Sequence, residues 1–324
     1  MNQLDLSPFS VRVAHRLAVG DDIVVLDLVA DDASPLPAFT AGAHLELQLQ
    51  SGPRQYSLCN DPLDRSRYRI AVHRVATGRG GSAEVYDQVQ TGQYIPVRGP
   101  FNHFEMHGQE REVLLLAGGI GITPVLAMAH HCHAQGTPFA LHYSGRTLSR
   151  MAFAQELCAG PLAAQVHLHA DDGVGAAPLQ LRATIGDYQM GRHLYVCGPQ
   201  GMIEAVRQSA AELGWPSDCV HYEHFGSNAA APRASDGSFE VRIQSTGRCI
   251  RVAAEQTVAQ ALNAAGIHIS VSCGAGVCGA CRTRIVSGTP EHRDLFYSEE
   301  EQARGDEFTP CCSRALSPVL VLDL

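Results

Sequence analysis

Four cysteines in the last quarter of the chain have the spacing of an iron–sulfur site. Cys273, Cys278 and Cys281 follow one another as C-x4-C-x2-C, and Cys311 comes after 29 intervening residues. Glycine and alanine fill most positions between the first three, which allows a tight loop whose N–H groups turn inward. Iron–sulfur clusters require thiolate ligands, and hydrogen bonds from such a loop to the sulfurs stabilise the reduced cluster. The pattern therefore predicts a plant-type [2Fe–2S] cluster.

Two other uses of these cysteines fit the sequence less well. Structural zinc sites usually bring their ligands as C-x2-C pairs, and disulfides belong to an oxidising compartment of which the chain has no other sign. The fourth ligand is ambiguous because Cys311 and Cys312 are adjacent, and only one of two neighbours on an extended backbone points inward. The spacing favours Cys311, which would leave Cys312 as a small buried side chain.

Composition limits the remaining possibilities. A chain of 324 residues is too long for one ordinary core, and 45% hydrophobic with 18% charged residues is typical of a soluble globular protein. The net charge of −9 argues against nucleic acid as a partner. All cationic residues are arginine, which excludes a Walker-type phosphate loop and a pyridoxal Schiff base. No charged n-region with an apolar run opens the chain, so we expect a cytoplasmic protein with no membrane segment.

The first hundred residues alternate in a way that predicts a small antiparallel β-barrel. Short apolar or alternating runs are separated by glycine, proline and aspartate turns. The predicted strands are 10–13, 23–29, 44–48, 55–58, 69–75 and 94–97.

Two motifs in this barrel suit a phosphate and an aromatic ring. Alternation places Arg54 and Tyr56 on one face of a strand and Ser57 on the other. An arginine beside an aromatic residue can hold a phosphate and stack on a ring, although an ordinary half-buried strand has the same pattern. The run Gly80-Gly81-Ser82 precedes a predicted helix at 83–89, and free N–H groups at a helix start attract phosphate.

From Arg111 onwards strands and helices alternate, which predicts a parallel sheet covered by helices on both faces. Nucleotides bind such sheets at the carboxyl ends of the strands. The predicted strands are 113–116, 139–143, 166–169 and 193–197, and the predicted helices follow Gly121, lie near Phe153 and span 202–213.

Two strand ends of this sheet carry glycine loops beside a helix start, where a pyrophosphate can approach the backbone closely. The first loop contains Gly118, Gly119, Gly121, Thr123 and Pro124, and the second contains Cys197, Gly198, Pro199 and Met202. Asp171 and Asp172 follow another strand and either bind a ribose diol or belong to a solvated loop.

A small, polar segment at 226–238 has no apolar period and is predicted to be a linker. Beyond it, 239–243 and 249–252 are predicted to form a hairpin, 258–265 a helix and 318–324 a closing strand. Together with the cysteine pattern, these elements predict an α+β ferredoxin (β-grasp) domain.

Along nearly its whole length the chain resembles the reductases of the phthalate dioxygenase reductase type, which include vanillate demethylase reductases. The resemblance implies a multidomain protein: an antiparallel β-barrel flavin domain (1–103), an α/β parallel-sheet NAD-binding domain (104–225), a linker (226–238) and a plant-type ferredoxin domain (239–324). It further implies that Arg54 and the turn at Gly80, Gly81 and Ser82 bind the flavin phosphate. A single phosphate subsite resembles FMN binding, although related reductases with such strands bind FAD.

The same resemblance assigns roles near the reacting atoms. Tyr56 would lie against the isoalloxazine ring, Ser57 near its N5 atom, and Phe225 would close over the flavin. The two glycine loops resemble the nicotinamide-dinucleotide loops of the family. Ser144 and Arg146 also suit a 2′-phosphate, whereas Asp171 favours the ribose diol of NADH.

The implied function is the reductase component of a multicomponent oxygenase. NADH delivers two electrons as a hydride and a [2Fe–2S] cluster accepts one, so a flavin must stand between them. The implied partner is a Rieske-type terminal oxygenase acting on an aromatic or similar small substrate. Two alternatives stay open. One is a stand-alone NAD(P)H-dependent flavin, iron or quinone reductase, and the other is a binding module with a structural zinc that binds a nucleotide as a regulatory ligand.

Overall fold

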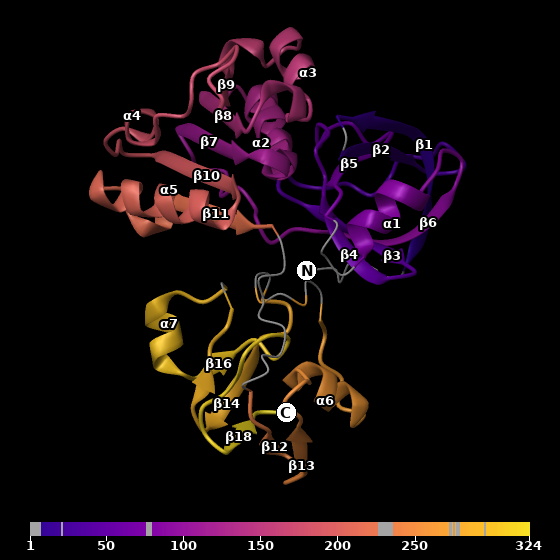
Figure 1. Ribbon diagram of the computed structural model, residues 1–324, viewed down its shortest axis with the longest axis vertical. Helices are drawn as coiled ribbons and strands as arrows, with labels where there is room; N and C mark the ends of the chain where they lie inside the picture. The colour runs from indigo at the N-terminus through magenta and orange to yellow at the C-terminus, as the bar shows by residue number, and fades with distance from the viewer. Residues whose placement is uncertain are drawn as a thin grey trace. The chain divides into compact units, whose positions relative to one another are not determined.

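The computed structural model describes residues 8–20, 22–75, 80–225, 236–271, 274, 276, 279–294 and 296–324. Its contacts divide the chain into two compact units, Met1–Phe225 and Gly226–Leu324 (Figure 1). None of the helices in these described stretches has the length and apolar character that a bilayer span requires.

An antiparallel six-stranded sheet forms the first part of unit Met1–Phe225, with strand order β4-β3-β6-β1-β2-β5. A bridge between Leu58 and Ile70 joins the end of β4 to β5, so the sheet closes on itself. Inward-facing residues such as Val11, Leu26 and Leu45 are fully buried in its interior. Its elements are β1 (Phe9–Val19), β2 (Ile23–Val29), β3 (His44–Leu49), β4 (Gly52–Ser57), β5 (Tyr68–His73), α1 (Gly81–Gln88) and β6 (Tyr94–Phe101).

This sheet confirms the predicted antiparallel barrel. All six predicted strands are present, and β1 runs six residues beyond its predicted end at Val13. The register of β1 against β2 shifts between Val13 and His15. Such a bulge interrupts the alternation by which a strand is recognised in a sequence, so the second half of β1 was not predicted.

A five-stranded parallel sheet forms the second part of this unit, with strand order β11-β10-β7-β8-β9. Its strands are β7 (Glu112–Gly118), β8 (Phe139–Gly145), β9 (Val166–Ala170), β10 (Arg192–Gly198) and β11 (Val220–His224). Its helices are α2 (Ile122–Gln135), α3 (Ala154–Ala159), α4 (Leu181–Ile185) and α5 (Gln200–Glu212), with 3-10 turns at Gly119–Gly121, Leu148–Arg150, Ala163–Gln165 and Ser217–Cys219.

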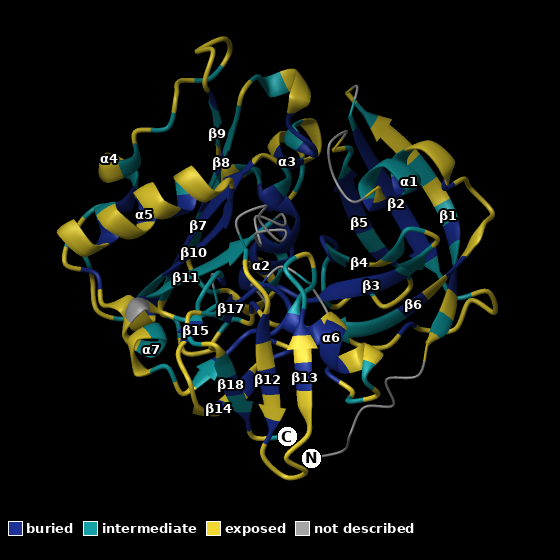
Figure 2. Ribbon diagram, turned by 60° about the horizontal axis from the view of Figure 1, so that its bottom comes forward, coloured by how far each residue is buried: buried dark blue, intermediate teal, exposed yellow. Residues whose placement is uncertain are grey.

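The predicted parallel sheet is confirmed, but β11 and α4 were not predicted. Strand β11 reads Val-His-Tyr-Glu-His, in which polar residues outnumber apolar ones. In Figure 2 the strands β7 and β10 are buried, whereas α5 is exposed on its outer side. The helices thus shield the sheet, as parallel strands require.

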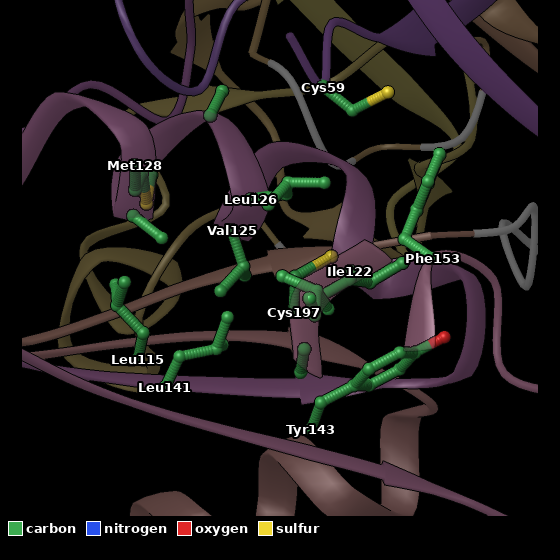
Figure 3. Packing of buried hydrophobic residues seen from close by; sticks show 14 of the residues in the cluster. Cys59, Leu115, Ile122, Val125, Leu126, Met128, Leu141, Tyr143, Phe153 and Cys197 are labelled. Carbon is green, nitrogen blue, oxygen red and sulfur yellow. The ribbon is translucent and has the colours of Figure 1, made fainter. Parts of the chain in front are cut away.

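The barrel and the parallel sheet share one hydrophobic core. Figure 3 shows Cys59 of the barrel beside Leu126 of α2, above a cluster that includes Val125, Leu141 and Phe153. An ion pair also joins the two parts, because Arg69 of β5 contacts Glu156 of α3 at 3.3 Å. The flavin and nucleotide motifs therefore lie in one compact unit, while the predicted boundary at 103/104 stays a prediction.

Unit Gly226–Leu324 contains a mixed sheet of order β13-β12-β18-β14-β16, in which β12 and β18 are parallel. Its elements are β12 (Phe239–Ile243), β13 (Cys249–Val252), α6 (Val258–Ala264), β14 (Thr283–Ser287), β15 (Pro290–Glu291), α7 (Glu299–Arg304), β16 (Glu307–Phe308), β17 (Arg314–Ala315) and β18 (Val319–Leu322). Apolar residues of α6, including Val258 and Leu262, pack in the same cluster as Leu320 and Leu322 of β18. This confirms the predicted α+β ferredoxin domain with its hairpin, helix and closing strand. Most of the predicted linker lies outside the described residues.

Candidate electron-transfer site

Arg54 and Gly81 come together at the start of α1. Gly80, the residue before the helix, has a left-handed backbone with φ +86°. A Cβ atom added to Gly81 would lie only 2.5 Å from Cγ and Nε of Arg54. Only glycine therefore lets the arginine lie across the first turn of the helix. The guanidinium is braced by hydrogen bonds to the carbonyls of Ser51 and Pro53, both at 2.8 Å.

This arrangement suits a phosphate. The first turn of a helix leaves N–H groups without intrahelical partners, and a guanidinium beside them adds a positive charge. The carboxylate of Glu84 accepts hydrogen bonds from the N–H groups of Gln50 (2.7 Å) and Ser51 (2.8 Å), which ties α1 to the β3–β4 turn. The structure thus brings together two motifs that are separated in the sequence by more than twenty residues.

The other predicted flavin residues lie close by with different exposure. Tyr56 is half-buried against the barrel core, and burial raises the pKa of its hydroxyl well above the ordinary value. Ser57 is 6% exposed at the end of β4. Ser82 accepts a hydrogen bond from the N–H of Val75 at 3.1 Å, so its oxygen is already bonded within the protein.

The two glycine loops touch each other at the carboxyl ends of β7 and β10. A Cβ on Gly118 would lie 2.6 Å from Sδ of Met202 and 2.8 Å from Cδ of Pro199. A Cβ on Gly121 would lie 2.3 Å from the carbonyl oxygen of Cys197. Glycine is thus required for α2 and α5 to begin side by side, which places two helix N-termini at one edge of the sheet.

Further residues of the first loop support this edge. Gly119 has φ +55°, and nothing lies within 4 Å of the position that a Cβ would take there. Thr123 donates a hydrogen bond from its hydroxyl to the carbonyl of Ile120 at 3.1 Å. Pro124 lies in the first turn of α2, where its missing N–H costs no hydrogen bond. A pyrophosphate requires such open space beside a helix start.

The residues expected to contact the adenosine ribose lie along the next strand ends. Backbone hydrogen bonds connect Asp171 to the carbonyl of Gly145 (3.0 Å) and Asp172 to that of Arg146 (3.3 Å). Arg146 is therefore held beside the two aspartates, whereas Ser144 pairs with His169 in the register of β8 and β9. The carboxylate of Asp172 accepts a hydrogen bond from the N–H of Val174 at 3.0 Å, which directs it to its own loop. Asp171 is exposed, so its carboxylate can accept from a diol.

Cys197 lies inside the protein, whereas we predicted it among the cofactor-binding residues. Its side chain is fully buried near Ile122 and Tyr143 (Figure 3), and burial raises the pKa of its thiol well above the ordinary value. The Cys197 side chain is therefore a neutral thiol that packs in the core. Its carbonyl lies against Gly121 in the loop contact.

Glu223 is a residue that sequence reasoning missed. It pairs with Cys197 in the register of β10 and β11, two residues before Phe225. Part of the residue is accessible, but its Oε2 atom is buried and has no hydrogen-bond partner among the described residues. Burial raises the pKa of this carboxyl to about 8. A glutamate at an inward position of a strand, two residues before the expected flavin-covering aromatic, was the available signal.

We expect Glu223→Gln to increase stability above pH 5. The carboxyl of Glu223 has a pKa near 4.5 in the unfolded chain and about 8 in the folded protein. The stability that its protonation contributes is therefore fully present below pH 4.5 and is lost as the pH rises to 8. The full loss in the free energy of unfolding is up to about 5 kcal/mol, which corresponds to a decrease of roughly 10 °C in Tm. Flavin release on heating, followed by fluorescence from pH 5 to 9, measures it. A Tm difference between variant and wild type that does not grow with pH would contradict this, and Glu204→Gln on α5 is an exposed control.

The cluster site is partly described. Cys281 and Cys311 are 4% and 6% exposed, while Cys273 and Cys278 lie outside the described residues. Gly276 and Gly279 have φ of +69° and +65°, and a Cβ on them would lie 2.4 Å from Sγ of Cys312 and 2.3 Å from the ring of Phe296. A tightly wrapped glycine loop over buried thiols fits a [2Fe–2S] cluster.

Cys311 and Cys312 are both buried, so burial does not distinguish them as ligands. Their side chains are hydrogen-bonded to each other, and this contact lowers the pKa of the Cys312 thiol. Cys312 also contacts two hydroxyls, Oγ1 of Thr309 at 3.1 Å and Oγ of Ser313 at 3.7 Å. The sulfur of Cys312 thus lies among polar groups and is hydrogen-bonded to them.

Two known protein families match parts of the chain. Residues 241–316 match the family described as 2Fe-2S iron-sulfur cluster binding domain. Residues 93–220 match the dimethylamine monooxygenase subunit DmmA-like N-terminal domain.

Relatives of similar length cover almost the whole chain. A vanillate O-demethylase oxidoreductase from a Pseudomonas species is 46% identical over 97% of this chain and 99% of its own. A phthalate dioxygenase reductase from Burkholderia cepacia is 35% identical, with 97% of each chain covered. Among solved structures, a phthalate dioxygenase reductase described as a modular structure for electron transfer from pyridine nucleotides to [2Fe-2S] aligns over 98% of both chains, with a TM-score of 0.77 and 35% identity. The chain therefore belongs to the phthalate dioxygenase reductase-like family of oxidoreductases, the reductase components of oxygenases.

Proposed function

We propose that the chain takes electrons from NADH at a bound FMN and passes them singly through a [2Fe–2S] cluster to a Rieske-type terminal oxygenase. One combination of features carries this proposal. Arg54 lies at the start of α1, the two glycine loops meet at one edge of the parallel sheet, and the same chain contains a ferredoxin domain. Relatives of the same length are oxygenase reductases. When bound, a flavin accepts two electrons as a hydride and releases them one at a time. We place this reaction in the cytoplasm.

In this proposal the barrel holds the flavin. Arg54 and the N–H groups at the start of α1 bind its single phosphate, and Gly81 leaves the space that the arginine needs. Tyr56 lies against the ring and Ser57 donates a hydrogen bond near its N5 atom. One phosphate subsite at the start of α1 suits FMN, because FAD carries a second phosphate and an adenosine that need a further subsite.

The parallel sheet holds the nicotinamide nucleotide. The N–H groups at the starts of α2 and α5 bind the pyrophosphate, and Asp171 accepts hydrogen bonds from the ribose diol. Phe225 lies directly after β11, and its ring covers the flavin until the nicotinamide ring takes the place of the phenylalanine. The chain's residues only bind, orient and exclude water, since hydride transfer to a flavin requires no protein nucleophile.

An anaerobic titration of the purified protein with NADH tests this proposal. Bleaching of the flavin absorbance followed by the electron paramagnetic resonance signal of a reduced [2Fe–2S] cluster is the expected result. A protein without flavin absorbance, or a cluster that stays oxidised after the flavin is reduced, would contradict it. Turnover of an added terminal oxygenase then distinguishes the oxygenase reductase from a stand-alone flavin, iron or quinone reductase.

We predict a preference for NADH over NADPH of roughly tenfold or more in kcat/KM. Asp171 beside the ribose would repel a 2′-phosphate, and tenfold corresponds to only about 1.4 kcal/mol. Arg146 at the neighbouring strand end acts in the opposite direction, so Arg146→Ala should widen the preference and Asp171→Asn should narrow it. Steady-state kinetics with both nucleotides measure this, and equal kcat/KM values in the wild type would contradict it.

A further inference from the structure

Two histidines of neighbouring strands form a hydrogen-bonded pair beside the expected nucleotide site. Strands β8 and β9 lie side by side at one edge of the parallel sheet (Figure 1), and their register places Ser144 opposite His169. Nδ1 of His142 lies 3.0 Å from Nε2 of His169, and the two rings stack with centroids 5.3 Å apart. Because side chains alternate along a strand, the pair lies on the sheet face opposite to Tyr143, which packs in the core with α2.

The His169 ring also holds the far end of the loop that follows β9. Its Nδ1 lies 3.2 Å from the carbonyl oxygen of Ala177, eight residues further along the chain. A carbonyl oxygen can only accept, so Nδ1 of His169 carries the hydrogen. In the neutral ring Nε2 of His169 is then an acceptor, and Nδ1 of His142 donates to it. The hydrogen bonds therefore run in one direction, from His142 through His169 to Ala177.

Burial keeps both rings in the neutral form that this direction requires. It lowers the pKa of His142 to about 4 and also lowers the pKa of His169. The ring of His167, stacked on His142 at 4.6 Å, and the guanidinium of Arg192 shift the pKa of His142 in the same direction. At pH 7 Nε2 of His169 thus remains an acceptor.

The loop from Asp171 to Ala177 has little else to fix its shape. Its first residues are hydrogen-bonded to the end of β8, and Leu148 lies against Gly175 in its middle. Gly173 and Gly175 have φ of +69° and +77°, and most of the loop is exposed. Small exposed residues bury little apolar area to offset the entropy of ordering, so the loop depends on the hydrogen bonds at its two ends. His169 supplies the bond at the second end.

We propose that His169, oriented by His142, is a positioning residue for the nicotinamide nucleotide: it holds the 171–177 loop closed and so keeps Asp171 directed at the ribose diol. The inference rests on the proposed function, because the loop affects the reaction only if NADH binds at this edge. The two fail separately. A wild-type flavin that NADH does not reduce would contradict the proposed function, whereas the variants below are compared with a wild type that NADH reduces.

Two substitutions of His169 separate its bond to the loop from its ring. The amide nitrogen of asparagine takes about the place of Nδ1, so His169→Asn can still donate to Ala177, whereas the amide nitrogen of glutamine lies near the place of Nε2. Loss of one hydrogen bond should raise KM for NADH about fivefold in His169→Gln, with kcat for ferricyanide reduction within about twofold of wild type. His169→Asn should stay within about twofold of wild type in both constants.

Nucleotide preference is the second readout. An Asp171 that is no longer held in place accepts less well from the diol and repels a 2′-phosphate less, so the ratio of kcat/KM for NADH to that for NADPH should fall several-fold in His169→Gln. It should not fall in His169→Asn. The matched control is His167→Gln, since His167 is exposed two residues earlier on the same face of β9, and it should match the wild type.

The contrast between the two His169 variants decides the proposal. Both lose the same imidazole ring, so a folding defect caused by its loss would affect them alike, and flavin content monitors it. Wild-type KM and nucleotide preference in His169→Gln would overturn the proposal. If His169→Asn is impaired as much as His169→Gln, packing of the ring rather than the bond to Ala177 holds the loop, and the positioning role is wrong.

Discussion

Cys311→Ser is expected to lose the iron and visible absorbance of the [2Fe–2S] cluster, whereas Cys312→Ser keeps both. A serine oxygen is a poor ligand for a site that requires four thiolates, so electron delivery to an oxygenase should fall by at least about 100-fold. Serine at 312 retains a hydroxyl that can bond to Oγ1 of Thr309, which lies 3.1 Å from Sγ of Cys312 in the wild type. Iron content and electron paramagnetic resonance of the reduced proteins measure the outcome.

Reduction of ferricyanide by NADH is the internal control for this pair, because it needs only the flavin and should be unchanged in both variants. Cys273→Ser, Cys278→Ser and Cys281→Ser are expected to behave like Cys311→Ser. The opposite pattern, in which Cys312→Ser loses iron and Cys311→Ser retains it, would show that Cys312 is the fourth ligand.

A fragment ending near Asn228 is expected to keep FMN and to reduce ferricyanide with NADH within about twofold of the intact rate, since a unit with its own core can fold alone. The division of contacts at Phe225/Gly226 and the hydrophobic cluster shared by barrel and parallel sheet support this cut. The fragment should drive an oxygenase at less than about 1% of the intact rate, because the one-electron carrier is missing.

The comparison requires equal flavin content in both proteins, and ferricyanide turnover again serves as the internal control. Adding the separate ferredoxin unit, residues 236–324, tests whether the two halves cooperate when they are not covalently linked. Oxygenase turnover by the fragment alone at the intact rate would remove the cluster from the electron path, and the proposed order of carriers would be wrong.

The sequence by itself determined the chemistry that this chain can hold. The spacing of Cys273, Cys278 and Cys281 predicts a plant-type [2Fe–2S] domain without any reference to structure, because ligand spacing is a local property of one loop. Alternation likewise located all six barrel strands, and the strand–helix order predicted the parallel sheet. Both patterns depend on which side of one element meets the core, and that information lies within a few consecutive residues.

Only the tertiary structure decided how these pieces meet. That Gly81 must be glycine follows from the Arg54 side chain lying across it, and that Gly121 must be glycine follows from the carbonyl of Cys197. Each contact joins residues far apart in the chain, so no local pattern contains it.

Burial and register were the second contribution of the tertiary structure. Cys197 looked like a loop residue at a cofactor edge, yet its side chain points into the core. The pairing of β10 with β11 brings Glu223 beside it, and Oε2 of Glu223 has no hydrogen-bond partner in the part of the chain that the structure describes. Asp294, in a charged stretch of the sequence, is fully buried because three donors from His292, Tyr297 and Ser313 surround it. Whether a charged side chain is solvated or buried depends on what packs over it, and part of that packing comes from residues far away in the chain, such as Ser313 here.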